Sequence, residues 1–218
     1  MKVATASFGN QNLAFASVKY DEWSQFSGLL TEAERCVAYS FVSEKRKIEF
    51  FAGRVAAKLA LAELQSDRTI CILNNDAGMP IVSDEKFAVS ISHSGDIAVA
   101  LAFESDCSFG VDIQIIRTKS VNALKHVVTE VFVPNDVEHL TAAWTMKEAL
   151  SKCLKTGFTL PYEEFLLADF VEKGQNKFWC TFTKYPQYIG KAVVWKNYVL
   201  AIIGNKEYIA NIEIENLL

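Results

Sequence analysis

The longest uninterrupted apolar run in this chain is Ile97–Phe103. It is far shorter than the ~20 residues that a membrane-spanning helix needs. A second apolar run, Phe87–Ser92, comes just before it, and His93-Ser94-Gly95-Asp96 joins the two. Short apolar runs bounded by turn-forming residues are typical of buried strands. This segment therefore predicts a hairpin inside a globular core, with His93 in its turn.

The remaining segments alternate between helical and strand-like patterns. Apolar residues at helical spacing predict helices over residues 43–64, 119–132 and 137–155. Strict alternation predicts a strand over residues 109–116, and further strands are expected at residues 177–183, 192–196, 198–203 and 208–214. These elements predict an α+β fold with mainly antiparallel sheet. Residues 103–109 carry the weakest pattern and mark a junction between two halves.

Charge and cysteine content narrow the class of protein. The chain has 218 residues, which is enough for one or two domains. Its 22 Lys and Arg against 26 Asp and Glu give a net charge of −4, whereas non-specific nucleic-acid binders are usually basic. No nucleic-acid or membrane partner is therefore expected. The five cysteines include no C-x-x-C pair, which disfavours disulfides and a structural zinc site and fits a reducing cytoplasm.

Two polar residues lie on one face of the alternating strand. Asp112 and Gln114 point away from its apolar face, roughly 7 Å apart, and Glu148 lies on the predicted helix 137–155. Carboxylate and amide oxygens suit Mg²⁺, which binds one or two carboxylates together with substrate phosphates. A plainer interpretation is also open, in which Asp112 is solvated and Glu148 forms an ordinary helical ion pair with Lys152.

Two further groups of side chains could meet an anion. Lys147 and Lys152 flank Glu148, which suits either a surface ion network or a general base beside phosphate-binding cations. His93 lies beside three serines, Ser90, Ser92 and Ser94, and is either an anion contact or an exposed turn residue. A hydrolase triad is not expected there, because the sequence has no G-x-S-x-G elbow.

A basic arc runs along the predicted helix 43–64. Lys47, Arg54 and Lys58 share one side of it, because steps of seven and four residues return to nearly the same angle. The arc is either a solvated helix face or a phosphate clamp, in which arginine gives bidentate contacts. Gly53 costs the helix about 1 kcal/mol relative to alanine. This cost suggests that neighbouring backbone or a ligand needs the space.

Read together, these segments resemble the Sfp-type 4′-phosphopantetheinyl transferases, in the variant with a W-x-x-K-E-A motif. The resemblance covers about residues 43–168 and rests on five motifs: the basic, aromatic, Gly-Arg helix Arg46–Arg54; Gly78-Met79-Pro80 for G-[KR]-P; Ser90–Ser94 for S-x-S-H-S; Phe109–Ile113 for G-[VI]-D-[IV]; and Trp144–Lys152 for W-x-x-K-E-[AS]-x-x-K. The aspartate strand and the K-E helix, in this order and at this separation, are its most specific part.

The resemblance implies two similar α+β halves with pseudo-two-fold symmetry in one monomeric chain. Residues 1–105 would contact the 3′-phosphate and adenine of coenzyme A, and residues 106–218 would hold Mg²⁺ and dock a carrier protein. The implied reaction moves the 4′-phosphopantetheine arm of coenzyme A onto a serine of an apo acyl or peptidyl carrier protein. Adenosine 3′,5′-bisphosphate is the other product. The carrier would belong to fatty-acid, polyketide or nonribosomal-peptide synthesis.

Matching positions assign roles to individual residues. Asp112 and Glu148 would bind Mg²⁺ with Gln114 as the third ligand, and Glu148 would also act as the base toward the carrier serine. Lys152, with Lys147, would neutralise the diphosphate. The other coenzyme A contacts implied are Arg46, Arg54, Gly78, Pro80, Ser92 and His93. Carrier docking would use the basic residues after the aspartate strand, which are Arg117, Lys119, Lys125 and His126.

Two positions depart from the family pattern. Gln114 stands where some members carry glutamate, and Met79 replaces the usual basic residue between glycine and proline. These departures leave room for an alternative, a catalytically silent module of the same fold that binds coenzyme A or the carrier. The intact Asp112, Glu148 and Lys152 argue against it. A third possibility is a different Mg²⁺-dependent phosphotransferase or phosphatase on another fold. A separation of Asp112 and Glu148 above about 10 Å would support neither metal interpretation.

Overall fold

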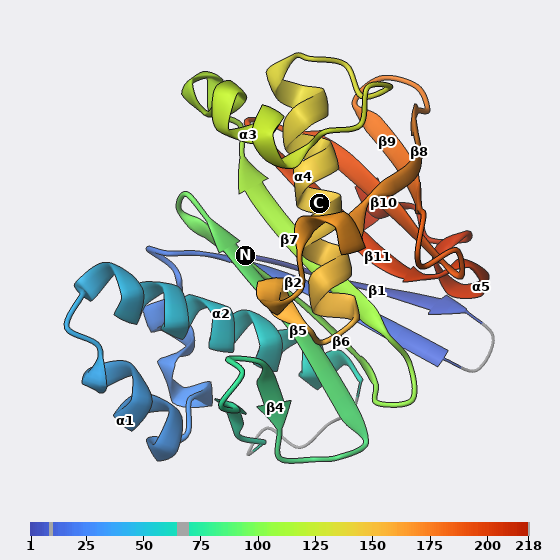
Figure 1. Ribbon diagram of the computed structural model, residues 1–218. Helices are drawn as coiled ribbons and strands as arrows, with labels where there is room; N and C mark the ends of the chain where they lie inside the picture. Colours follow the sequence, from blue (N-terminus) through green and yellow to red (C-terminus); the bar gives the residue numbers. More distant parts are fainter. Residues whose placement is uncertain (9–10, 65–69, 218) are drawn as a thin grey trace. The chain divides into compact units, whose positions relative to one another are not determined.

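The computed structural model describes residues 1–8, 11–64 and 70–217, and the chain divides into two compact units (Figure 1). The first unit spans Met1–Cys107 together with Leu217, and the second spans Ser108–Asn216. In each unit a long helix packs on an antiparallel sheet. This arrangement confirms the predicted α+β class and the two similar halves.

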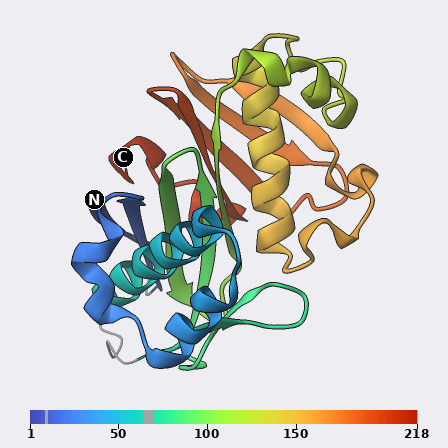
Figure 2. The ribbon, with the colours of Figure 1, turned by 90° about the vertical axis from the view of Figure 1, so that its left-hand side faces the viewer.

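An antiparallel four-stranded sheet, in the order β1-β2-β6-β5, forms the base of the first unit. Its strands are β1 Lys2–Phe8, β2 Gln11–Lys19, β5 Phe87–Ser94 and β6 Ile97–Glu104. Helix α2 (Glu44–Glu63) covers one face of this sheet, as Figure 2 shows. The helix begins at Ser43, whose side chain accepts a hydrogen bond from the Arg46 backbone N–H. Phe51 and Val55 of α2 are buried in the core between helix and sheet.

Smaller elements surround this core. They are the 3₁₀ helix η1 Trp23–Leu29, helix α1 Glu32–Ser40, and strands β3 Ile72–Asn74 and β4 Pro80–Val82. Helix α1 begins with a reciprocal capping box between Thr31 and Glu34. Strands β3 and β4 pair only with each other, as a separate two-stranded sheet. The first unit therefore carries a small hairpin that is not part of its main sheet.

The second unit has a five-stranded antiparallel sheet in the order β7-β11-β10-β9-β8. Its strands are β7 Phe109–Ile115, β8 Leu167–Glu172, β9 Lys177–Phe182, β10 Tyr188–Trp195 and β11 Tyr198–Asn205. Helix α4 (Val137–Cys153) lies along this sheet (Figure 2) and buries Met146 and Leu150 against it. Its first turn is capped by the Asp136 side chain, which accepts from two backbone N–H groups.

Short helices complete the second unit. They are η2 Thr118–Ser120, α3 Val121–Val127, η3 Gly157–Thr159, η4 Tyr162–Phe165, α5 Lys206–Ile209 and η5 Ile214–Leu217. Across the described residues, every helix is too short or too polar to pass through a bilayer.

The structure confirms the main predicted elements and corrects three of them. Helices α2 and α4, strand β7 and the β5–β6 hairpin lie where the sequence predicts. His93 belongs to β5 rather than to the turn, because the tight turn needs only Gly95, at φ +63°, and Asp96. The helix predicted over residues 119–132 ends at Val127, where a run of β-branched residues begins. The strand predicted over residues 208–214 is replaced by α5, which Asn205 caps.

A glycine allows β7 and α4 to lie unusually close together. A Cβ atom built on Gly110 would be 1.9 Å from the Ala149 carbonyl oxygen and 2.7 Å from the Cys153 backbone nitrogen. These neighbours are backbone atoms of α4, so a rotamer change cannot relieve the clash. The separation of strand and helix is thus set by the absence of a side chain at Gly110.

We predict that Gly110→Ala lowers the free energy of unfolding by more than ~3 kcal/mol, because the backbone of β7 or α4 must shift. The matched control is Gly28→Ala, where a Cβ would meet nothing within 4 Å. It should change stability by less than about 0.5 kcal/mol. Urea denaturation of both variants measures the difference. Equal losses in the two variants would contradict this account of the strand–helix contact.

Candidate functional site

Four polar side chains meet where β7 lies against α4. Asp112 and Gln114 are two residues apart on β7 and therefore share one face of the strand. Glu148 and Lys152 are one turn apart on α4 and share one face of the helix. The close approach at Gly110 brings these two faces together.

Direct contacts connect all four side chains. Lys152 Nζ lies 2.6 Å from Asp112 Oδ1, in an ion pair whose carboxylate is only 1% exposed. Gln114 Nε2 donates to Glu148 Oε2 at 2.5 Å and to Asp112 Oδ2 at 3.2 Å. Because one nitrogen reaches both carboxylates, they are close enough to share an ion, well within the limit of about 10 Å set from the sequence.

The carboxyl group of Glu148 has a strongly raised pKa. Burial is the largest cause, followed by the charge of Asp112 and a hydrogen bond with it, and together they raise the pKa of Glu148 from 4.5 to about 8. The charge of Lys152 and the hydrogen bond from Gln114 act in the opposite direction. Glu148 is therefore poised to exchange a proton near neutral pH.

The donors of this cluster fit a magnesium ion. Mg²⁺ usually takes one or two protein carboxylates and completes its shell with waters and substrate phosphates. Asp112 and Glu148 supply the two carboxylates. A site built from three or more His, Cys, Asp or Glu side chains is not found among the described residues. Gln114 turns its amide nitrogen toward the carboxylates. Rotating this amide so that its oxygen and nitrogen exchange places would add a third oxygen ligand.

Lys147 does not join this cluster, although it precedes Glu148 in the sequence. Its side chain is 1% exposed, and Nζ lies 2.8 Å from Glu130 Oε1 and 3.0 Å from the Val127 carbonyl oxygen. Glu130 also accepts a hydrogen bond from the Leu167 backbone N–H. Adjacent residues of a helix point in different directions, which separates the two side chains. The structure thus gives Lys147 a buried structural contact in place of the predicted contact with a diphosphate.

The first unit contains a cavity of about 220 Å³, bounded by α2, β5 and the β3–β4 hairpin. Five of the residues that the sequence assigns to coenzyme A line it, namely Arg46, Arg54, Gly78, Pro80 and His93. Two aromatic rings hold its arginines. The Arg46 guanidinium lies 5.3 Å from the Phe41 ring centroid, and that of Arg54 lies 4.3 Å from the Phe50 ring centroid.

Ser92, like Lys147, belongs to that predicted set but does not line the cavity. It is buried, whereas the side chain of the next residue, His93, is 39% exposed and has Nδ1 3.9 Å from Glu49 Oε1. Successive strand residues point to opposite faces of a sheet, so β5 can present only one of the two to the cavity.

The basic arc predicted on α2 is not a single phosphate clamp. Lys58 is buried in an ion pair with Glu34 at 3.0 Å, and Lys47 pairs with Glu44. Of the three cations in the arc, Arg54 alone lines the cavity. Gly53 makes room for a neighbouring side chain of the same unit, because a Cβ there would be 3.0 Å from Ile91 Cγ2.

Several cavity residues were missed by the sequence analysis. They are Phe41, Glu49, Phe50 and Asn74. The position of Phe50, four residues before Arg54 on the same helix, is a signal that could have identified it. Asn74 lies beyond the helix, and no spacing rule connects it with Arg54.

Comparison with known families finds a match in each unit. Residues 34–103 match the 4′-phosphopantetheinyl transferase N-terminal domain, and residues 108–203 match the 4′-phosphopantetheinyl transferase superfamily. The Asp112–Glu148 cluster lies in the second match and the cavity residues from Phe41 to His93 lie in the first.

Three similar proteins share the name holo-(acyl-carrier-protein) synthase. A holo-[acyl-carrier-protein] synthase from Geobacillus sp. is 44% identical over 84 residues, which is 33% of this chain and 70% of the relative. A protein of the same name from Streptococcus thermophilus is 31% identical over 101 residues, or 41% of this chain and 85% of the relative. A solved structure of a holo-(acyl-carrier-protein) synthase from Bacillus anthracis, in complex with CoA (3′,5′-ADP), is 30% identical and covers 42% of this chain and 93% of its own, with a TM-score of 0.36.

We predict that the protein without added metal loses stability as the pH rises from about 4.5 to about 8. A carboxyl group whose folded pKa is raised favours folding while it is protonated, and this contribution is lost as it ionises in the folded state. For Glu148 the loss should amount to about 2 to 4 kcal/mol.

Urea denaturation at a series of pH values measures this slope. Glu148→Gln, which cannot ionise, should flatten it over the same range. A slope that is identical in both proteins would show that the pKa of Glu148 is not raised in the folded state.

Proposed function

Because the chain belongs to the 4′-phosphopantetheinyl transferase superfamily, we propose that it transfers the 4′-phosphopantetheine arm of coenzyme A to a serine of an apo carrier protein. The observation that carries this proposal is the cluster of Asp112, Gln114, Glu148 and Lys152 between β7 and α4. Two ionisable carboxylates, a lysine and a raised pKa form a suitable site for phosphoryl-type transfer.

In the proposed reaction the serine Oγ of the carrier bonds to the phosphorus next to pantetheine. The bond from that phosphorus to the bridging oxygen of the diphosphate breaks, and adenosine 3′,5′-bisphosphate leaves. Glu148 takes the serine proton, directly or through a water. The position of Glu148 in the cluster, next to Gln114 and Asp112, supports this role. The ammonium of Lys152, which is held on Asp112, offsets negative charge on the diphosphate.

Asp112 and Glu148, with the side-chain oxygen of Gln114, are the residues that would hold Mg²⁺. The ion would supply Lewis-acid polarisation and charge neutralisation at the diphosphate. The burial of Asp112 favours ion binding at this place, because two neighbouring carboxylates in a buried site repel each other without a cation.

The cavity of the first unit would hold the nucleotide part of coenzyme A. Arg46, Arg54 and His93 supply donors for phosphate, and Gly78 and Pro80 shape the β3–β4 side of the wall.

We assign the chain to the Sfp-type branch and expect it to act as a monomer. The support is that one chain contains both a match to the N-terminal domain and a match to the superfamily domain. All five cysteines are free, which is consistent with our proposal of a reducing cytoplasm.

We expect one phosphopantetheine arm to be added to each apo carrier when the protein is mixed with coenzyme A and Mg²⁺. Intact-mass spectrometry, with one fatty-acid and one peptide-synthesis carrier, measures the reaction. Glu148→Gln should slow it at least 100-fold, because the base is lost. Glu138→Gln is the matched control, since Glu138 is exposed in the first turn of the same helix.

Three outcomes decide between the candidates. Addition that depends on Glu148 supports the transferase. Binding of coenzyme A without addition to either carrier supports the silent module of the same fold. Neither binding nor addition overturns the proposal.

The carrier is proposed to dock on the segment after β7. Four basic side chains there are exposed, namely Arg117, Lys119, Lys125 and His126. Val131 and Phe132 follow them and are 99% and 47% exposed. Exposed cations beside apolar side chains suit an acidic, helical partner, and they can steer it to an enzyme whose own net charge is −4.

We predict that Arg117→Glu with Lys125→Glu lowers kcat/KM for the carrier about tenfold and leaves the KM for coenzyme A unchanged. Lys173→Glu with Lys206→Glu is the control, because it changes the net charge equally at exposed lysines outside this segment. Steady-state kinetics at low and high salt measure the effect. A loss of equal size in both variants would mean that net charge acts, rather than docking on this segment.

A further inference from the structure

The β3–β4 hairpin is an unusually small element to form one wall of a binding cavity. Each strand has three residues, and the two pair only with each other. Isolated two-stranded hairpins are marginally stable in water. Asn74, Gly78 and Pro80 nevertheless line the cavity from this hairpin. Contacts outside the hairpin must therefore fix its position.

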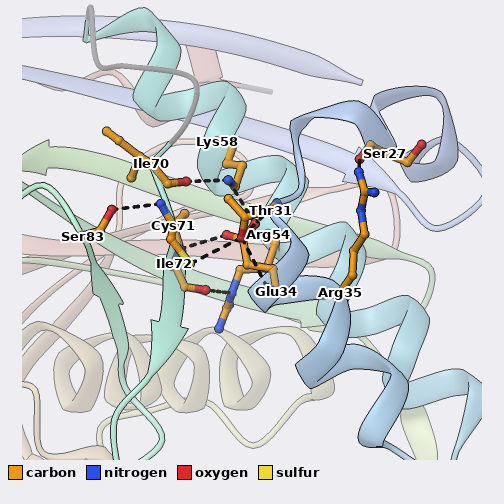
Figure 3. Close-up of polar contacts among 10 residues, drawn as sticks. All are labelled: Ser27, Thr31, Glu34, Arg35, Arg54, Lys58, Ile70, Cys71, Ile72 and Ser83. Atoms are coloured by element: carbon orange, nitrogen blue, oxygen red, sulfur yellow. Dashed lines mark hydrogen bonds and ion pairs between the residues drawn. The ribbon is translucent and has the colours of Figure 1, made fainter.

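Glu34 of α1 makes such a contact. Its side chain is fully buried, and Oε1 accepts a hydrogen bond from the Ile72 backbone N–H at 2.9 Å (Figure 3). The other oxygen, Oε2, accepts from the Thr31 backbone N–H at 2.7 Å and lies 3.0 Å from Lys58 Nζ. Helix capping and the ion pair thus use one oxygen, and the second oxygen is directed to β3.

Arg54 donates hydrogen bonds to two other polar groups of the same strand. Its Nε donates to the Ile72 carbonyl oxygen at 2.8 Å, and Nη2 donates to Asn74 Oδ1 at 2.5 Å (Figure 3 draws the first of these bonds). Ile72 is therefore held at its N–H by Glu34 and at its carbonyl by Arg54. These bonds use two of the five N–H donors of the guanidinium, so the others are available to an anion in the cavity.

The charges of this group also point to the cavity. One buried carboxylate, Glu34, faces two buried cations, Arg54 and Lys58. Burial lowers the pKa of Arg54 to about 10, and the charge of Glu34 opposes that change, so Arg54 remains charged at neutral pH. Lys58 is the cation paired with Glu34, and Arg54 lines the cavity. The group thus retains one positive charge that a bound phosphate would neutralise.

We infer that Glu34 is a positioning residue: by holding the Ile72 N–H it fixes β3, and through β3 it sets Arg54 and Asn74 for a phosphate of the bound nucleotide. The inference rests on the proposed function for the identity of that nucleotide. Glu34 itself lies behind the strand and does not line the cavity. Supporting contacts of this kind decide whether a binding group is held precisely enough to act.

Two double variants isolate the hydrogen bond from the charge. Glu34→Gln/Lys58→Met and Glu34→Leu/Lys58→Met carry the same charge. Both remove the whole Glu34–Lys58 ion pair, and both leave Arg54 in place. Replacing a buried ion pair by side chains of similar volume is often neutral for stability. They differ in the side-chain amide: glutamine keeps one oxygen, which can accept from the Ile72 or the Thr31 backbone N–H, and leucine has none.

The readout is the preference for a second phosphate. Calorimetry gives the ratio of the dissociation constants of adenosine 5′-monophosphate and adenosine 3′,5′-bisphosphate. This ratio does not depend on the fraction of folded protein, because partial unfolding raises both apparent dissociation constants by the same factor. We expect the parent to prefer the bisphosphate at least tenfold, the glutamine variant to keep this preference within threefold, and the leucine variant to lose it.

Each other result has a defined meaning. If both variants keep the preference, Glu34 positions nothing, and the inference is overturned while the proposed function stands. If both lose it equally, charge and not the bond to Ile72 is responsible, which also overturns the inference. If the parent itself shows no preference, the nucleotide assignment of the cavity fails and the inference fails with it.

Discussion

The backbone contact between β7 and α4 is the constraint on which the candidate catalytic cluster depends. A strand and a helix normally keep a layer of side chains between them, and Gly110 removes that layer at one point. Side chains of the two elements can then meet directly, so Lys152 reaches Asp112 and Gln114 reaches Glu148. The same closeness confines two carboxylates in a buried space and raises the pKa of Glu148. The contacts within the cluster and the raised pKa of Glu148 thus have the same cause, which is the close approach of β7 and α4 at Gly110.

Burial distinguishes two lysines of this chain, Lys58 and Lys147, from Lys152. Lys58 and Lys147 are almost completely buried, and each is paired with a carboxylate of its own unit, Glu34 or Glu130. Lys152 also contacts a carboxylate but keeps 30% of its side chain exposed. Removing one partner of a buried pair is costly, since an uncompensated charge is left inside the protein. Lysines that look equivalent in the sequence therefore differ in their burial and in their partners.

The sequence predicted the parts of the fold that depend on local periodicity. Helices α2 and α4, strand β7 and the β5–β6 hairpin have clear patterns, and the grouping of Asp112 with Glu148 followed from motif order. Strands β1 and β2 were missed, although the Gly9-Asn10 pair between them in the sequence is a hairpin signal that could have identified them. The buried ion pairs of Lys147 and Lys58 could not be predicted from the sequence, for another reason. Whether a lysine points to solvent or to a buried carboxylate depends on residues far away in the chain, such as Glu130 and Glu34.

The contacts that hold the β3–β4 hairpin beside the cavity of the first unit have a consequence for the evolution of this protein. Its turn is closed by its own atoms, with the Met79 N–H bonded to the Asn75 side chain and Gly78 at φ +81°. The contacts that fix the hairpin are made at Ile72 and Asn74, away from the tip. Substitutions at Asp76, Ala77 or Met79 therefore leave the anchors intact. During evolution the tip residues can therefore be substituted, and the ligand contacts made there can change, while the contacts that anchor the hairpin are kept.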